Sequence, residues 1–300
     1  MESCNPTSKW CTLKISTNKG MKILEKTILE VIKENYDQIF SAEKKVARFI
    51  LNNPEKAVNS NVSELANYSG VSDATVIRFC KHIGYQGYYQ LRIILSRDLG
   101  RDQSQNMPSR NVALDSVSAL FQSYASELLE ICKGLNPNKI LDCVSLIKNC
   151  DHAHIIAVGN TSPLAQYMGF RLGRLGVKCT YNMLPEYFFN HINLAGQNDI
   201  VIAISQSGTS KQVVQAMELA KEKKLKIIAI TAYEFSPISK LADYVLLSGV
   251  KESSFDYYKS YSHLNETAVI DALLHFVTNE EKINSSKADK PEMILSEYKF

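Results

Sequence analysis

The stretch DIVIAISQSGTSKQVVQAMELA, residues 199–220, decides the fold of the second half of the chain. Residues 200–204 form a continuous apolar run, which is typical of a parallel strand buried on both faces. Residues 211–220 repeat apolar side chains near helical spacing. The glycine and hydroxyl side chains between these two segments predict a tight turn that leads from a strand directly into a helix.

The same alternation continues on both sides of this stretch. Short apolar runs bounded by turns predict five strands, at residues 152–159, 177–182, 199–205, 225–231 and 243–249. Helical patterns occur at residues 113–133, 138–149, 162–175, 210–223 and 262–279. Strands that alternate with helices predict a three-layer α/β domain with a five-stranded parallel sheet, which we assign to residues 113–280.

The first half of the chain predicts a separate all-helical domain at residues 21–99. Within it, VSELANYSGVSDATVIRFCKHIG (62–84) has the spacing of a helix-turn-helix. Asn61 and Glu64 predict a capping box, Gly70 a left-handed turn, and Ser72 the cap of the next helix. We expect Leu65, Val71, Val76 and Phe79 to be buried between the helices.

The second helix of such a motif enters the major groove of DNA with its first turns. The side chains that we expect to face outward, and to contact bases or phosphates, are Ser72, Asp73, Thr75, Arg78 and Lys81. Among them, Arg78 suits a guanine. Spacing alone leaves open a protein-docking or purely structural role for this domain.

The amino-acid composition excludes several other classes of protein. The 300 residues are 45% apolar and 22% charged with a net charge of +3, which excludes a disordered chain. Seven cysteines without a C-x-x-C pair favour reduced thiols in a cytoplasmic protein over disulfides or a metal site. No apolar run approaches the roughly 18 residues of a membrane span. The polar segments 1–20, 100–112 and 281–300 are expected to be an arm, a linker and a tail.

Two loops at the carboxyl ends of predicted strands carry hydroxyl side chains. The first loop holds Asn160, Thr161 and Ser162, and we expect the last two to cap the helix that follows. The second holds Ser205, Gln206, Ser207, Gly208, Thr209 and Ser210. Free N–H groups at a helix start favour an anion, so the pattern indicates a phosphate site. Helix caps without a ligand remain the alternative.

Dinucleotide and P-loop glycine patterns are absent from the sequence, and we expect no cofactor.

Two resemblances narrow these alternatives. Residues 41–95 resemble the N-terminal domain of the RpiR family of bacterial transcriptional regulators, most specifically in Leu65-Ala66, Gly70-Val71-Ser72, Ala74-Thr75, Arg78-Phe79-Cys80-Lys81 and Gly84-Tyr85-Gln86-Gly87-Tyr88. Residues 152–250 resemble the sugar isomerase (SIS) domain, a flavodoxin-like fold that binds phosphosugars. Residues 205–210 match that family's S-x-S-G-x-T motif, with Ser210 in place of the threonine.

These resemblances imply a DNA-binding regulator of carbohydrate metabolism that senses a phosphorylated sugar and acts as a homodimer or homotetramer. Glu266, on the last predicted helix, is expected in the same cleft. SIS domains also occur in isomerases, and the alternative is a phosphosugar isomerase or lyase with an accessory helical domain. Its general base would come from Glu186, His191, His263 or Glu266. A third alternative is a SIS scaffold whose helical domain binds protein.

Overall fold

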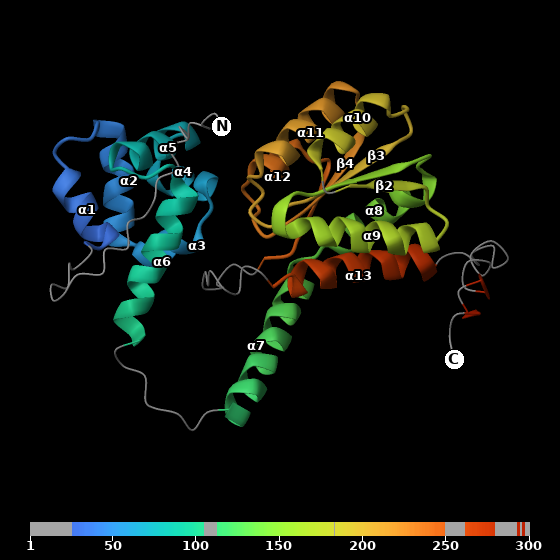
Figure 1. Cartoon of the computed structure of the whole chain (residues 1–300), viewed down its shortest axis with the longest axis horizontal. Coiled ribbons are helices and arrows are strands. Elements are labelled where there is room, and N and C mark those ends of the chain that lie inside the picture. The colour runs from blue at the N-terminus through green and yellow to red at the C-terminus, as the bar shows by residue number, and fades with distance from the viewer. Residues whose placement is uncertain are drawn as a thin grey trace, which may run out of the picture.

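The computed structural model describes residues 26–104, 113–182, 184–249 and 262–279, together with 293, 294, 296 and 297. These residues form a helical domain and, after it, an α/β domain (Figure 1). Residues 1–20, most of 281–300 and residues 105–112 of the expected linker lie outside the described residues. Within the described ranges, no helix combines the length and the apolar character that crossing a membrane requires.

In the residues that the structure describes, the helical domain packs six helices around one apolar core. They are α1 (Ile28–Asn35), α2 (Ser41–Asn52), α3 (Pro54–Asn59), α4 (Val62–Ser69), α5 (Asp73–His82) and α6 (Tyr88–Ser104). Leu65, Val76 and Phe79 are fully buried, as predicted, and Val71 packs partly buried against the same core. Each such side chain stabilises the domain by about 1.5–3 kcal/mol relative to exposure.

Helices α4 and α5 form the predicted helix-turn-helix. Glu64 N donates to Asn61 Oδ1 at 2.9 Å, and Asn61 N donates to Glu64 Oε2 at 3.1 Å, which confirms the capping box. Gly70 ends α4 with a φ of 64°, a left-handed conformation that costs glycine little. Ser72 caps α5 by accepting a hydrogen bond from Thr75 N at 3.3 Å.

The α/β domain contains the predicted five-stranded parallel sheet. Its strands are β1 (Ala153–Ile156), β2 (Cys179–Tyr181), β3 (Ile200–Ile204), β4 (Lys226–Thr231) and β5 (Tyr244–Leu247), in the order β2-β1-β3-β4-β5. The chain moves from β1 to β2 on one side and then returns to β3 on the other. Ligands of open α/β sheets bind at such a reversal, beyond the carboxyl ends of the strands.

Helices cover both faces of the sheet. One face packs against α8 (Pro137–Asn149), α9 (Ser162–Arg174) and α13 (Leu264–Asn279), and the other against α10 (Pro185–Leu194), α11 (Lys211–Glu222) and α12 (Pro237–Leu241). Along β3, Ile202 and Ile204 enter the first apolar layer, whereas Val201 and Ala203 enter the second. Helix α7 (Ala113–Gly134) projects from this body (Figure 1).

Two sequence expectations need correction. Helix α6 continues beyond Gly100 to Ser104, so the first residues of the expected linker are helical. Helices α3, α10 and α12 were not anticipated, and each carries a proline in its first turn. A proline ends a preceding helix but also fits the start of a new one, and tertiary packing stabilises these short helices.

The two domains meet at the loop between β4 and α12, residues 232–236, which we call the β4–α12 loop. Asn61 Nδ2 donates to Phe235 O at 2.8 Å, and Arg92 Nη2 donates to Tyr233 OH at 2.6 Å. Because this loop follows the carboxyl end of β4, the helical domain lies against the edge of the sheet where ligands bind.

Candidate functional site

Residues 205–210 run from the end of β3 into α11, and we call this loop the cradle. Ser205 Oγ lies 3.1 Å from Ser210 Oγ, and Thr209 Oγ1 donates to Ser207 Oγ at 3.0 Å. Ser210 is the N-cap residue of α11, but its side chain makes no capping hydrogen bond. An anion can therefore take the hydrogen bonds of the first N–H groups of α11 and the positive end of its dipole.

Gly208 allows the cradle to pack closely. Its φ is +67°, a left-handed conformation that other residues rarely adopt. A Cβ atom at this position would collide with the Ser236 hydroxyl and approach Thr231 Oγ1. The cradle backbone thus lies directly against the start of α12, with no room for a side chain.

The loop between β1 and α9 differs from the sequence expectation. Gly159–Thr161 form a 3-10 turn before α9. The buried Thr161 hydroxyl donates to Val158 O at 2.9 Å, and Ser162 Oγ donates to Gly159 O at 2.5 Å. Thr161 occupies the N-cap position of α9, but the prediction that the hydroxyls of Thr161 and Ser162 cap the helix is wrong, because both bond to carbonyl groups of their own loop.

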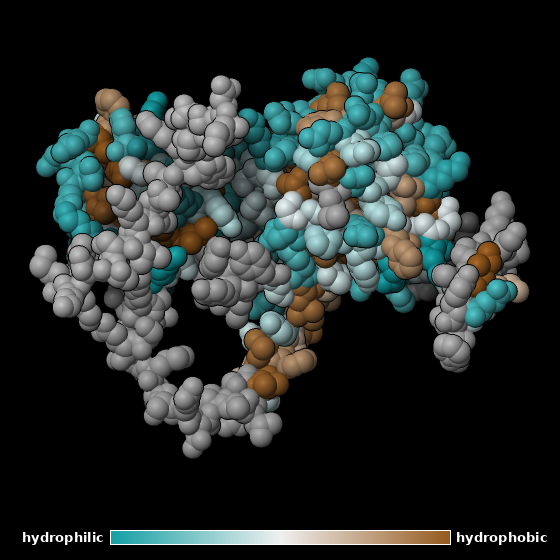
Figure 2. Space-filling view, viewed as in Figure 1, coloured by the Kyte–Doolittle hydropathy of each residue, from teal (hydrophilic) through white to brown (hydrophobic). Residues whose placement is uncertain are grey.

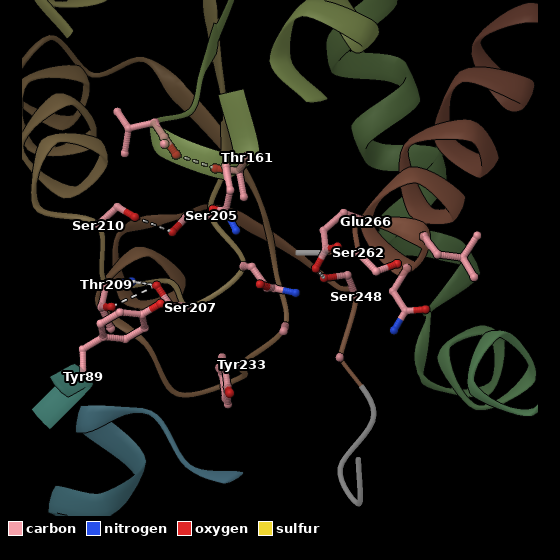
Figure 3. Close-up of a pocket in the computed structure, with 18 of the residues that line it drawn as sticks. Tyr89, Thr161, Ser205, Ser207, Thr209, Ser210, Tyr233, Ser248, Ser262 and Glu266 are labelled. Atoms are coloured by element: carbon pink, nitrogen blue, oxygen red, sulfur yellow. Dashed lines mark hydrogen bonds between the residues drawn. The ribbon is translucent and has the colours of Figure 1, made fainter. Parts of the chain in front are cut away.

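A pocket of about 450 Å³ opens beside the cradle, within the usual size range of small-molecule sites (Figure 3). It brings together eight of the ten residues predicted for it: Asn160, Thr161, Ser205, Gln206, Ser207, Thr209, Ser210 and Glu266. Gly208 and Ser162 do not line it. Gly208 lies against Ser236, and the hydroxyl of Ser162 is engaged by Gly159.

Glu266 brings a buried carboxylate to the pocket from α13. Its Oε1 accepts a hydrogen bond from Ser248 Oγ at 3.1 Å. Among the described residues, its Oε2 finds no hydrogen-bond partner, and it lies 3.5 Å from His263 Nδ1. The nearby carboxylate raises the pKa of His263. A buried acceptor oxygen with open capacity suits a hydroxyl donor such as that of a sugar.

The other proposed general bases do not reach the pocket. Glu186 and His191 are exposed on α10, and His263 is not among the lining residues. Of the four candidates, Glu266 is the one that lines the pocket. Among the described residues, no group of three or more His, Cys, Asp or Glu side chains could hold a metal ion.

Several lining residues were missed from the sequence. They are Tyr124 and Glu127 of α7, Tyr233 of the β4–α12 loop, Ser248 and Gly249 after β5, and Asn59, Tyr89 and Arg92 of the helical domain. Ser248 could have been found, because it follows a strand at the same edge of the sheet. The sequence around the three residues of the helical domain does not indicate that they line a pocket, because local patterns do not predict how two domains pack.

The outer surface of α5 holds most of the predicted DNA-contacting residues. Ser72, Arg78 and Lys81 are exposed, and Asp73 is half-buried and accepts a hydrogen bond from Ser63 Oγ at 2.5 Å. Thr75 is only 7% exposed, and its Oγ1 lies 3.0 Å from Ser72 Oγ. The expectation that Thr75 faces outward is wrong, because its hydroxyl supports the helix cap.

A buried carboxylate positions Arg78. Glu43 of α2 is fully buried, and its Oε1 accepts from Arg78 Nε at 3.2 Å, while its Oε2 lies 2.8 Å from His82 Nδ1. The Arg78 side chain remains 58% exposed. The exposed His82, which sequence reasoning missed, is held beside it by the same carboxylate.

We predict that Gly208→Ala destabilises the α/β domain by about 1–3 kcal/mol, because the methyl group meets Ser236 and the left-handed backbone is strained. Gly173→Ala in α9 is the matched control, since a Cβ there meets nothing within 4 Å. Urea unfolding followed by circular dichroism measures both variants. Equal stability of Gly208→Ala and the wild type would contradict the close packing of the cradle.

Comparisons with known proteins agree with this architecture. The model of the rpiR-family helix-turn-helix domain matches residues 26–102, and the SIS-domain model matches residues 146–276. An uncharacterized HTH-type transcriptional regulator of Thermotoga maritima is 24% identical over 91% of this chain and 99% of its own. The HTH-type transcriptional regulator HexR of Pseudomonas aeruginosa is 28% identical over 84% of this chain and 90% of its own.

A solved structure shares the arrangement of both domains. The Vibrio vulnificus NanR protein, complexed with ManNAc-6P, aligns with a TM-score of 0.78 at 23% identity, over 90% of this chain and 98% of its own. At this identity the likeness shows the fold alone. The two domain models in this order and the regulators related over most of their length lead to one conclusion: the chain belongs to the RpiR family of helix-turn-helix transcriptional regulators that carry a SIS domain.

Proposed function

We propose that this regulator binds a phosphorylated sugar in the cradle and duplex DNA through α5. The start of α11 supports the binding of the phosphate. The side chain of Ser210 does not cap this helix, and the cradle holds four hydroxyl groups that line the pocket. The ligand of NanR, ManNAc-6P, belongs to the same chemical class. Because chromosomal DNA is the partner, we expect the protein to act in the cytoplasm.

We expect hydrogen bonds to contribute more to the binding free energy of the phosphate than the helix dipole does. The dipole supplies about 0.3–1 kcal/mol, or up to ~2 kcal/mol where it is partly buried. Each hydrogen bond to a charged group contributes about 1.5–3 kcal/mol. The hydroxyls of Ser207, Thr209 and Ser210 therefore supply most of the affinity for the phosphate. At the other end of the pocket, Glu266 Oε2 accepts a hydroxyl of the sugar.

The DNA half rests on the exposed face of α5. Glu43 holds Nε of Arg78 while the Arg78 side chain stays 58% exposed, and we expect the guanidinium to reach the two acceptors of a guanine. We expect Ser72 and Lys81, which are exposed, to contact phosphates on either side, and Asp73 lies at the start of the same helix. Thr75 supports this surface from inside.

The family favours sensing over catalysis. An aldose–ketose isomerase needs a base beside the reacting carbon, and Glu266 is the one candidate of the four that lines the pocket. The relatives from Thermotoga maritima and Pseudomonas aeruginosa, which match 91% and 84% of the chain, are named as transcriptional regulators. We therefore assign Glu266 to binding and not to proton transfer.

An apolar stripe on α7 supports an oligomer. Val117, Leu120 and Phe121 are exposed near the start of this helix, and Figure 2 shows apolar side chains gathered along it. Residues spaced three to four apart lie on one face of a helix, and exposed apolar faces of this kind mark protein contacts. We propose that a second copy of the chain covers this stripe in a homodimer, which can pair again into a tetramer.

We predict that a thermal-shift screen with ManNAc-6P and hexose 6-phosphates finds a stabilising phosphosugar. At 100 times its Kd, such a ligand adds about 2.7 kcal/mol to the free energy of unfolding. The double variant Ser207→Ala, Ser210→Ala should lose this gain, whereas Ser145→Ala on the exposed side of α8 should keep it. A full response by the double variant would place the phosphate elsewhere.

We predict that Lys81→Gln reduces the salt dependence of DNA binding by about one unit of slope, because one phosphate contact is lost. The control is Lys139→Gln, an exposed lysine of α8 in the other domain. Fluorescence anisotropy with promoter fragments from the source genome, over a range of salt concentrations, measures both. Identical slopes for the wild type and Lys81→Gln would remove α5 from the DNA contact.

We predict that Phe121→Glu shifts the protein to smaller species in light scattering, because a charge on the stripe opposes the contact between copies. Leu194→Glu changes an even more exposed apolar side chain, at the end of α10, and should leave the size unchanged. A dimer that persists in Phe121→Glu would show that the copies meet on another surface.

A further inference from the structure

One wall of the pocket comes from the helical domain. Asn59, at the end of α3, and Tyr89 and Arg92 of α6 line it together with the cradle. Among the described lining residues, Arg92 is the only lysine or arginine, whereas Glu127 and Glu266 bring carboxylates. Within the part of the chain that the structure describes, the lysine or arginine that a bound anion meets there thus belongs to the domain that carries α5.

Arg92 is fixed at the boundary between the domains. It is only 5% exposed, and its Nε donates to Val58 O within the helical domain. Its Nη2 donates to Tyr233 OH at 2.6 Å, and the guanidinium carbon lies 5.7 Å from the centre of the Tyr233 ring. A planar guanidinium held in this way is pre-organised for a phosphate or carboxylate oxygen.

The β4–α12 loop is bonded to the cradle at the pocket. Ala232 N donates to Gln206 O at 3.0 Å, and the Thr231 hydroxyl donates to the same oxygen at 3.2 Å. Ser236, at the other end of this loop, lies against Gly208 with no space between them. A ligand that orders the cradle therefore also orders this loop.

The β4–α12 loop is also hydrogen-bonded to the helix-turn-helix. Phe235 O accepts a hydrogen bond from Asn61 Nδ2, the side chain that also caps α4 through its Oδ1. Both functional atoms of this amide are used, one for the start of α4 and one for the SIS domain. The loop therefore contacts the helical domain at two places, the start of α4 and Arg92 of α6.

We propose that the effector site is shared between the two domains: Tyr89 and Arg92 contact the bound phosphosugar, and the β4–α12 loop transmits its presence to α4. This inference rests on the proposed function and identifies where the effector touches the DNA-binding domain. A ligand that contacts both domains stabilises the arrangement in which they touch. Because Arg78 stays exposed in that arrangement, the effector sets the orientation of α5 and does not cover it.

The contact is tested by calorimetry on the full chain, with ManNAc-6P, glucose 6-phosphate and inorganic phosphate as probes. Arg92→Gln is expected to weaken the binding of the phosphosugar by about tenfold or more, because a charge-assisted hydrogen bond is lost. The matched control, Arg97→Gln, changes an exposed arginine of the same helix and should bind within about twofold of the wild type.

A second variant guards against misfolding of Arg92→Gln. Tyr89 is 61% exposed, so Tyr89→Ala should fold, and it is expected to bind the phosphosugar severalfold more weakly. Tyr187→Ala, a comparably exposed tyrosine of α10, is its control. Wild-type affinity in Tyr89→Ala, or in a folded Arg92→Gln, would overturn the shared site while leaving the proposed function intact.

Hydrogen exchange measured by mass spectrometry tests the path to α4. In the wild type, the phosphosugar is expected to slow exchange in peptides covering the cradle and α4. Asn61→Ser keeps a hydroxyl cap for α4 but loses the bond to Phe235 O. The slowing should then persist in the cradle and disappear from α4. Asn136→Ser, which changes the capping residue of α8, is the matched control and should behave as the wild type.

The outcomes separate the two proposals. Equal slowing of α4 in Asn61→Ser and the wild type would overturn transmission through the β4–α12 loop. No slowing of the cradle in the wild type with any of the three probes would overturn the proposed function itself, and the shared site with it.

Discussion

At Gly208 the backbone of the cradle reaches the start of α12 without a side chain between them, and the rest of the site depends on this approach. The left-handed turn directs the chain into α11 so that its uncapped N–H groups border the pocket. The same contact ties the cradle to the β4–α12 loop, and that loop contacts the helical domain. A local steric constraint thus connects the proposed phosphate site with the neighbouring domain.

The buried strands make this connection rigid. β3 and β4 are fully or almost fully buried, and both end at the edge where the cradle and the β4–α12 loop lie. Strands packed on both faces resist small displacements, so movement is confined to the loops and to the boundary between the domains. The helical domain has its own core and is joined to the sheet edge by hydrogen bonds from Asn61 and Arg92. A few kcal/mol at this boundary are enough for allosteric coupling.

The sequence predicted features that depend on neighbours in the chain. The alternation of strands and helices, the capping box at Asn61 and the left-handed Gly70 each follow from local periodicity or turn chemistry, and the structure confirms them. The cradle was also found, because its hydroxyls follow a buried strand directly. Local reasoning failed at Thr75 and Ser162, whose hydroxyls bond to nearby groups of their own segments, a choice that spacing does not reveal.

Features that depend on packing between distant segments could not be predicted. Tyr89 and Arg92 lie more than a hundred residues before the cradle, and no pattern in α6 indicates that they line a pocket. The short helices α3, α10 and α12 depend on tertiary contacts, since isolated helices of this length are marginal in water. The burial of Glu43 could not be predicted either, because an acidic residue near a helix start is commonly solvated.

A phosphosugar that contacts both domains must change the affinity of the full chain for its own promoter DNA, which is measured with and without a saturating phosphosugar. We expect the affinity for DNA to change by about 5- to 150-fold, and the affinity for the phosphosugar to change by the same factor when DNA is bound, as linkage requires. Tight binding of both ligands with unchanged affinities would show that the pocket and α5 are not coupled.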